Sequence, residues 1–176
     1  MRSRRPPRLL DSEDELYNAA LRALMRRAHS IHEMKEYLSR RAVDKEIIGQ
    51  VIARLRERNY LDDARFARDF ARHHATARKQ GRFRVARELR ARGVPDPHIE
   101  AALDSVFEET NEAESVRERI RRKLAHSRAP LDEKKLASLY RSLLAAGFSA
   151  DVIRSEIRRA TRGEVAEIPE VEPLGE

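Results

Sequence analysis

The sequence lacks cysteine and tryptophan, and it has only five phenylalanines, four tyrosines and six glycines in 176 residues. Without cysteine, disulfide frameworks, thiolate metal sites, iron–sulfur clusters and thiol nucleophiles are excluded. Long apolar runs are missing as well. No stretch approaches the about 20 residues that cross a bilayer, and residues 1–10 contain no signal-peptide apolar region. These absences predict a cytoplasmic protein with no membrane contact and no disulfides.

Charge is abundant where aromatic and apolar material is scarce. Charged residues make up 38% of the chain, against about 25% in a typical globular domain, so several small cores are favoured over one large core. The net charge is +7. Arginine supplies most of the positive charge, and its planar fork suits phosphates and carboxylates. Codon usage in a GC-rich genome is the alternative explanation, so the placement of the charge has to decide.

Proline is absent between Arg8 and Val94, and good helix formers dominate throughout. Apolar residues recur at helical spacing, as in Ile48, Val51, Ile52 and Leu55, and nowhere alternate as in strands. The pattern predicts an all-α fold.

A pattern recurs three times along the chain, at offsets of about 51 and 54 residues. In each copy a leucine is followed four residues later by a small residue and then an apolar one, which is typical of a helix exit. A capping residue and two isoleucine-type core positions follow. The three copies are Leu38, Ala42, Val43, Asp44, Ile48 and Ile52; Leu89, Gly93, Val94, Asp96, Ile99 and Leu103; and Leu143, Gly147, Phe148, Ser149, Ile153 and Ile157.

A further helix precedes each copy, at residues 16–27, 64–77 and 113–125. Nine helices in three three-helix repeats are therefore expected, joined by short connections that make neighbouring repeats stack into an elongated, curved body. The predicted organisation is a basic disordered arm (1–13), repeats at 14–60, 61–109 and 110–162, and an acidic disordered tail (163–176).

The middle repeat holds nearly all the excess positive charge. Between Asp62 and Val94 ten bases face only four acids. If Phe66, Phe70 and His74 face inward, the helical period places Arg65, Arg68 and Arg72 outward in one stripe. A polyanionic or acidic partner is predicted for this cluster, whose candidate binding residues are Arg65, Arg68, Arg72, Arg78, Lys79, Arg82, Arg84, Arg87, Arg90 and Arg92.

Other constellations favour structural roles. The aromatic residues Tyr60, Phe66, Phe70, Phe83 and Phe107 could stack on bases, but their spacing favours core packing. Asp62 and Asp63 could form a catalytic or Mg²⁺ pair, but before a helix they fit a cap and a first-turn acid. Neither of the histidine pairs, 29/32 and 73/74, forms a convincing metal site. No phosphate-binding glycine loop is present, so no enzyme activity, metal or cofactor is predicted.

The run from Asn59 to Phe70, with Arg78, Gly81, Arg84 and the segment Glu88 to Val94, resembles the central motif of the RecX family. The resemblance extends over roughly residues 14–162 and includes the three-repeat architecture. Ala42 and Asn59 stand where the family commonly has glycine. Asparagine tolerates the left-handed conformation, whereas Ala42 would be strained in it.

RecX proteins regulate the bacterial recombinase RecA. The resemblance implies a protein that lies in the groove of the RecA filament on single-stranded DNA and limits filament extension, ATP hydrolysis and strand exchange, with possible direct contact to DNA phosphates. The three stacked repeats themselves predict an elongated monomer. The alternative is a helix-turn-helix protein that reads duplex DNA. The scarcity of asparagine and glutamine argues against that alternative, since these side chains commonly read bases.

Overall fold

The structure, a computed structural model, describes residues 9–125 and 133–161. Over these residues the chain forms nine α-helices, and the only β-type pairing within them is an isolated bridge between Leu10 and Ala42. The predicted all-α fold is confirmed. The helices are α1 (Glu13–Leu24), α2 (Ile31–Ser39), α3 (Ile47–Glu57), α4 (Asp63–Thr76), α5 (Arg82–Arg90), α6 (Asp96–Glu109), α7 (Glu112–Ala125), α8 (Glu133–Ala145) and α9 (Ala150–Ala160).

The helices belong to two compact units. The first unit contains residues 9–69 and 89–102, and the second contains residues 70–88 and 103–161. Helices α4, α5 and α6 each contribute residues to both units. None of the described helices is long and apolar enough to span a membrane.

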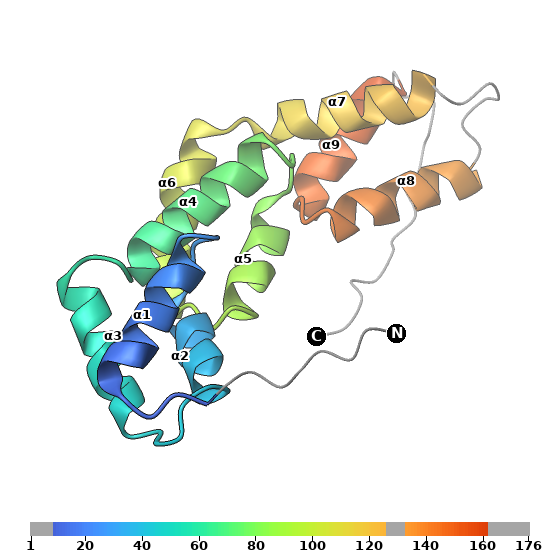
Figure 1. Cartoon of the computed structure of the whole chain (residues 1–176). Helices are drawn as coiled ribbons and strands as arrows, with labels where there is room; N and C mark the ends of the chain where they lie inside the picture. Colours follow the sequence, from blue (N-terminus) through green and yellow to red (C-terminus); the bar gives the residue numbers. More distant parts are fainter. Residues whose placement is uncertain (1–8, 126–132, 162–176) are drawn as a thin grey trace, which may run out of the picture. The chain divides into compact units, whose positions relative to one another are not determined.

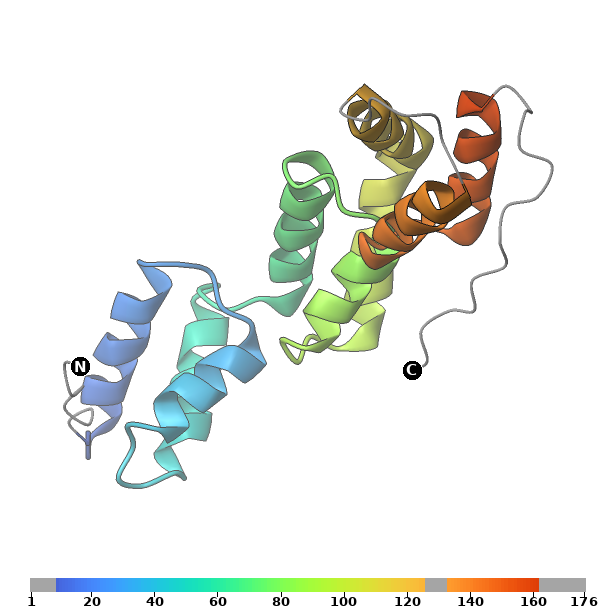
Figure 2. The same cartoon turned by 90° about the vertical axis from the view of Figure 1, so that its right-hand side faces the viewer.

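Each unit contains one complete three-helix bundle. In the first unit α1, α2 and α3 pack against one another around Leu16, Met34 and Leu55 (Figures 1 and 2). In the second unit α7, α8 and α9 do the same around Val116, Leu143 and Ile153, and α7 packs most extensively on α9. Small separate cores are what the high charge content predicts.

The recurring apolar positions form these cores. All nine of the repeated leucine and isoleucine-type positions are buried. The three that start the pattern, Leu38, Leu89 and Leu143, are almost fully inaccessible to solvent. The repeat found in the sequence therefore marks core positions.

Two of the three helix exits have the expected conformation. Gly93 and Gly147 are left-handed, with φ of 68° and 89°, and the following Val94 and Phe148 are buried. The amides of Val94 and Phe148 donate back to the carbonyls of Leu89 and Leu143, which closes the last helical turn.

The first exit differs from the expectation. Ala42 is buried without a positive φ, so the predicted strain is absent, and Val43 is exposed instead of folding back. The cause is Leu10, whose amide donates to the Arg41 carbonyl (2.7 Å) and whose carbonyl accepts from the Val43 amide (2.9 Å). Asn59 is left-handed, with φ of 56°.

The capping predictions were correct at one site of three. The Ser149 hydroxyl accepts from the Val152 amide at the start of α9. Asp44 was wrongly predicted as a cap, because α3 begins only at Ile47 and the Asp44 carboxylate instead accepts from the Glu46 amide. Asp96 was also predicted as a cap, but it is the first residue of α6, because Pro95 before it supplies the carbonyl that accepts the first hydrogen bonds of the helix.

The predicted terminal segments lie mostly outside the described residues. The acidic tail, 163–176, and residues 1–8 of the basic arm are not described. Residues 9–13 of the arm are ordered, contrary to the prediction: Leu10 forms the bridge, Ser12 caps α1 and Glu13 begins it. This part of the arm belongs to the first bundle.

Candidate partner-binding surface

Helix α4 carries the predicted arginine stripe. Its N-terminus is capped by Asp62, whose carboxylate accepts from the Arg65 amide at 3.0 Å, and this hydrogen bond lowers the pKa of Asp62. Arg65, Arg68 and Arg72 are exposed, as predicted. Their spacing of three and four residues places them along one side of the helix.

The buried face of α4 is made mainly by alanines. Ala67, Ala71 and Ala75 are buried, whereas Phe66 and Phe70 are only half-buried. Small side chains at four-residue spacing allow the backbone of another element to approach closely. The inward-facing side of α4 was predicted correctly, but its alanines are more deeply buried than its phenylalanines.

His74 is buried as predicted and sits in a polar network. Its ring stacks on Phe70, with 3.8 Å between ring centroids, and its Nδ1 donates to the Gln80 side chain at 2.5 Å. A carboxylate oxygen of Glu88 lies 3.5 Å from the same nitrogen, and Arg84 pairs with Glu88 at 2.9 Å. Burial lowers the pKa of His74 despite these partners.

Three of the ten candidates are exposed arginines without an acidic partner among the described residues. Arg68, Arg72 and Arg87 form no ion pair with any carboxylate in the described part of the chain. Arg65 instead donates to the carbonyl of Asn59 at 2.6 Å, which satisfies a backbone acceptor just after α3. Arg68 and Arg72 are therefore the members of the stripe whose charge is most available.

Four other candidates neutralise acids within the chain. In the second unit Arg82 pairs with Asp104 at 2.7 Å, and Arg84 pairs with Glu88. In the first unit Arg90 pairs with Asp96 at 2.8 Å, and Arg92 pairs with Glu33 at 2.7 Å. These pairs reduce the charge that the four side chains can offer to a partner. The remaining candidates, Arg78 and Lys79, lie in the loop between α4 and α5.

Two aromatic residues contradict the expectation of core packing. Phe83 is 63% exposed and Tyr60 is 49% exposed, whereas Phe66, Phe70 and Phe107 are partly buried. Phe83 is the second residue of α5, where its amide donates to the Gly147 carbonyl at 3.1 Å. The backbone at this position makes the contact, and the ring is left outside the core.

Asp63 has a more specific structural role than a first-turn acid. Its side chain is buried and accepts a hydrogen bond at 2.9 Å from the Ile31 amide, the first residue of α2. The equivalent contact recurs in the second unit, where Glu112 at the start of α7 accepts from the Arg82 amide at the start of α5, also at 2.9 Å. An acid that begins one repeat therefore caps the second helix of the preceding repeat.

The helix exits complete each joint between repeats. The Ser30 hydroxyl donates to the carbonyl of Arg92, next to Gly93, at 2.6 Å, and the Gly81 amide donates to the carbonyl of Ala146, next to Gly147, at 2.9 Å. Ser30 and Gly81 each directly precede the second helix of their repeat. A Cβ on Gly81 would lie 2.2 Å from the Gly147 oxygen, so this joint requires glycine.

Glu33 strengthens the joint of the first unit. Burial alone would raise the pKa of its carboxylate, but the hydrogen bond and charge of Arg27, with help from Ser30 and Arg92, hold the pKa below its usual range. Glu33 also completes a capping box with Ser30. The charge of Arg92 thus serves packing between repeats.

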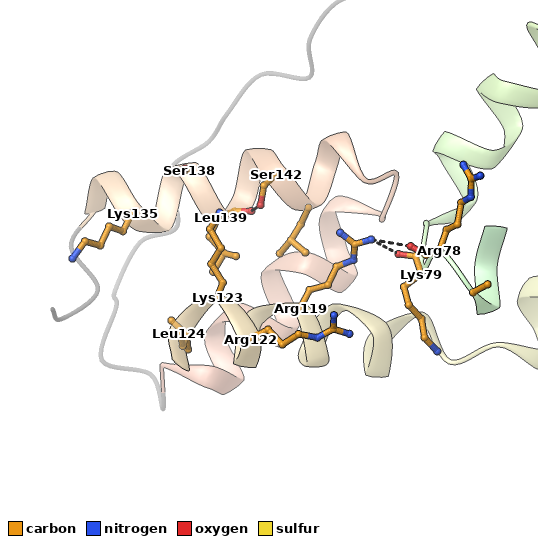
Figure 3. A pocket seen from close by; sticks show the side chains of 12 residues that line it. Arg78, Lys79, Arg119, Arg122, Lys123, Leu124, Lys135, Ser138, Leu139 and Ser142 are labelled. Atoms are coloured by element: carbon orange, nitrogen blue, oxygen red, sulfur yellow. Dashed lines mark hydrogen bonds between the residues drawn. The ribbon is translucent and has the colours of Figure 1, made fainter. Parts of the chain in front are cut away.

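The sequence analysis missed a basic cavity in the second unit. It lies between α7 and α8 beside the α4–α5 loop and has a volume of about 990 Å³ (Figure 3). Besides the candidates Arg78 and Lys79, four basic residues line it. The signal was available as a dense run of bases at residues 117–123. The four residues are Arg119, Arg122, Lys123 and Lys135.

An ion pair between buried Glu156 and half-exposed Arg117 joins α9 to α7. Glu156 is 4% exposed and accepts two hydrogen bonds from the Arg117 guanidinium, at 2.9 and 3.1 Å. These hydrogen bonds lower the pKa of Glu156 and keep it ionised.

Among the residues that the structure describes, no group of three or more histidine or acidic side chains could hold a metal ion.

Family models match both of the first two repeats. Residues 17–55 match the model described as RecX, first three-helix domain, and residues 62–103 match RecX, second three-helix domain. Two solved structures share the fold. The crystal structure of RecX from Lactobacillus salivarius has a TM-score of 0.68 at 23% identity and covers 84% of this chain and 95% of its own. A second crystal structure, of a regulatory protein RecX, has a TM-score of 0.74 at 19% identity and covers 82% of this chain and 72% of its own.

Relatives of known name match over most of the sequence. Regulatory protein RecX of Halorhodospira halophila is 35% identical over 145 residues, which are 82% of this chain and 87% of that protein. The RecX of Thermobifida fusca is 30% identical over 93% of this chain and 90% of its own length. The RecX of Oceanobacillus iheyensis is longer, and the match covers 56% of it.

Fold, repeat pattern and these similarities define a class of all-α proteins built from three-helix repeats. The chain belongs to the RecX family of regulatory proteins.

Proposed function

We propose that this protein inhibits RecA by binding in the groove of the RecA filament on single-stranded DNA, with the exposed arginines of α4 as a main contact. Membership of the RecX family supports regulation of RecA. The observation that carries the choice of surface is the pair Arg68 and Arg72, which are exposed one helical turn apart without a carboxylate partner in the described chain. Arg87 on α5 is a further exposed cation that has no carboxylate partner among the described residues.

The action is binding and not catalysis. Arginine guanidinium groups pair with phosphate or carboxylate oxygens in a planar fork. Arg68 and Arg72 lose no ion pair with the described residues when they bind such a partner. A protein held in the filament groove limits filament extension and strand exchange, because it occupies the space that incoming subunits and DNA require.

Direct reading of duplex DNA has less support. A helix-turn-helix protein reads bases from the N-terminal residues of its recognition helix. Here the third helices of the repeats start at Ile47 after Glu46, at Asp96, and at Ala150 before Asp151. Acidic residues at these helix starts repel phosphates, so the filament remains the proposed partner.

The test is RecA-catalysed ATP hydrolysis on single-stranded DNA, measured with increasing amounts of this protein. We expect hydrolysis to fall as the protein approaches the RecA concentration, and electron microscopy to show shorter filaments. This protein without RecA serves as the control for hydrolysis of its own. An unchanged rate at equimolar protein would overturn the proposal.

A further inference from the structure

The cavity of the second unit has the chemistry of a site for an anionic ligand. Six of its lining side chains are basic, and none of the described lining residues is acidic. Helix α7 and helix α8 supply opposite walls, and the α4–α5 loop closes one end (Figure 3). The basic residues are Arg78, Lys79, Arg119, Arg122, Lys123 and Lys135.

Arg119 has no carboxylate partner among the described residues, whereas its neighbour Arg122 pairs with Glu118. Its guanidinium donates to the carbonyls of Lys79 at 2.7 Å and of Arg78 at 3.2 Å, which are neutral acceptors (Figure 3). Its buried Nε has no hydrogen-bond partner among the described residues. Burial, and then the charges of Arg122 and Arg84, lower the pKa of Arg119. A bound anion would relieve this repulsion.

The loop that receives Arg119 is itself strained. Lys79 has a φ of 50°, in the left-handed region that residues with a Cβ rarely occupy. This conformation accompanies the donation from Arg119 to the two loop carbonyls. The Arg119 guanidinium is therefore held in place by backbone carbonyls and by no carboxylate of the described residues.

The remaining lining residues favour a peptide over a nucleic acid. They include Leu124, Leu139 and Leu143, together with Ser138 and Ser142. No aromatic ring is among the described lining residues, so bases would find no stacking surface. A segment that alternates carboxylates with aliphatic side chains complements both the cationic and the leucine side chains that line the cavity.

We propose that the cavity is a docking site for the chain's own acidic segment, residues 163–176. This segment contains five glutamates and no base, and its apolar residues alternate with the glutamates. Such a segment complements the cavity in charge and in apolar character. The glutamates are Glu164, Glu167, Glu170, Glu172 and Glu176, and the larger apolar residues are Val165, Ile168, Val171 and Leu174.

Chain length permits this docking. Residue 161, the last one described, directly follows α9, which packs on α7 in the same bundle. An extended segment of 14 residues reaches about 45 Å, whereas α7 is only about 21 Å long. The docked segment neutralises the cavity, and an acidic partner has to displace it.

The absence of native cysteine makes a direct test possible. A nitroxide label on Leu174→Cys in the full-length chain is then unique. We expect selective loss of amide NMR signal at residues 122, 123, 138 and 142, and recovery of that signal at high salt, because salt screens exposed charges. Signal loss that is absent, or spread evenly over the chain, would overturn the proposal.

Charge reversal in the cavity is the second test of docking. The double substitution Lys123→Glu with Lys135→Glu changes α7 and α8 while leaving the Arg119 contacts in place, and it should abolish the selective signal loss. The matched control, Arg154→Glu with Arg158→Glu on α9, carries the same change in charge and should retain it. Persistence of the signal loss in the cavity variant would refute docking.

Binding of a labelled oligothymidylate to the same variants tests the other class of ligand. Weaker oligonucleotide binding by the cavity variant, with unchanged signal loss, would assign the cavity to nucleic acid and overturn the proposal. None of these measurements contains RecA. Their failure is therefore distinguishable from failure of the proposed function.

Discussion

At the scale of single residues, the glycines differ in whether their backbone conformation and their neighbours exclude a side chain. Gly147 combines a φ of 89° with a virtual Cβ only 2.3 Å from the Arg84 amide nitrogen. Gly93 has a φ of 68°, but its Cβ would meet the His32 side chain, which can move. Gly49 lies exposed in α3 with open space around it. Sequence spacing identified the two helix exits, but it could not reveal their neighbours from other repeats.

The effect of alanine substitution on the free energy of unfolding should differ among these three glycines in the same way. Gly147→Ala should lower the free energy of unfolding by about 2–4 kcal/mol, because it combines backbone strain with a clash against backbone atoms. Gly93→Ala should cost less. Gly49→Ala should raise stability by about 1 kcal/mol, since alanine is the better helix former. Urea denaturation measures all three, and equal losses for the three variants would contradict the assigned roles.

His74 should make stability depend on pH. Burial lowers its pKa, so the folded state binds a proton less readily than the unfolded state does. Stability is therefore full above the unfolded pKa of about 6.5 and decreases as the pH falls from there toward the lowered folded pKa. His29, whose pKa is also lowered by burial, acts in the same direction.

The contribution of His74 can be isolated by substitution. His74→Gln should flatten the decrease in unfolding free energy between pH 7.5 and pH 5.5, although the variant is less stable overall. His73→Gln, on the exposed neighbour, should leave the decrease as it is in the parent protein. The prediction fails if both variants show the parent's pH dependence in urea denaturation.

At the scale of elements, the helices were largely predictable and the joints between them were not. Leucine spacing and proline absence gave the helices because these are local signals. The prediction for the first helix exit, at Ala42, was wrong because Leu10, more than 30 residues away, replaces the expected turn. Asp63 was recognised as belonging to a helix start, but its bond to Ile31 of another repeat has no local signature. Contacts between repeats depend on packing that one segment does not encode.

Removal of the joint acid should weaken α2 specifically. Asp63→Ala should lower the free energy of unfolding by about 1–2 kcal/mol, because the Ile31 amide loses its acceptor and the helix start loses a negative charge. Hydrogen exchange should become faster at Ile31. Asp62→Ala is the control, since Asp62 accepts from the Arg65 amide of α4. Faster exchange at Ile31 in the control, or none in Asp63→Ala, would contradict the joint.

At the scale of the whole molecule, the positive charge that is available to a partner does not follow the number of basic residues in each segment. The middle segment was predicted as the binding region because it holds ten bases. Ion pairs within each unit engage Arg82, Arg84, Arg90 and Arg92, and the cavity adds bases from the third repeat. Which arginines pair with acids is decided by tertiary contacts. The sequence could therefore identify the basic region without identifying its available members.

The most direct test of the account compares two double variants in binding to RecA filaments on single-stranded DNA. Arg68→Glu with Arg72→Glu reverses the available charge of α4, and Arg154→Glu with Arg158→Glu makes the same change in charge on α9. We expect the α4 variant to bind at least about tenfold more weakly, with the largest loss at low salt, while the α9 variant stays close to the parent protein. Equal filament binding by both variants, with native helical content in each, would contradict the claim that α4 carries the interaction.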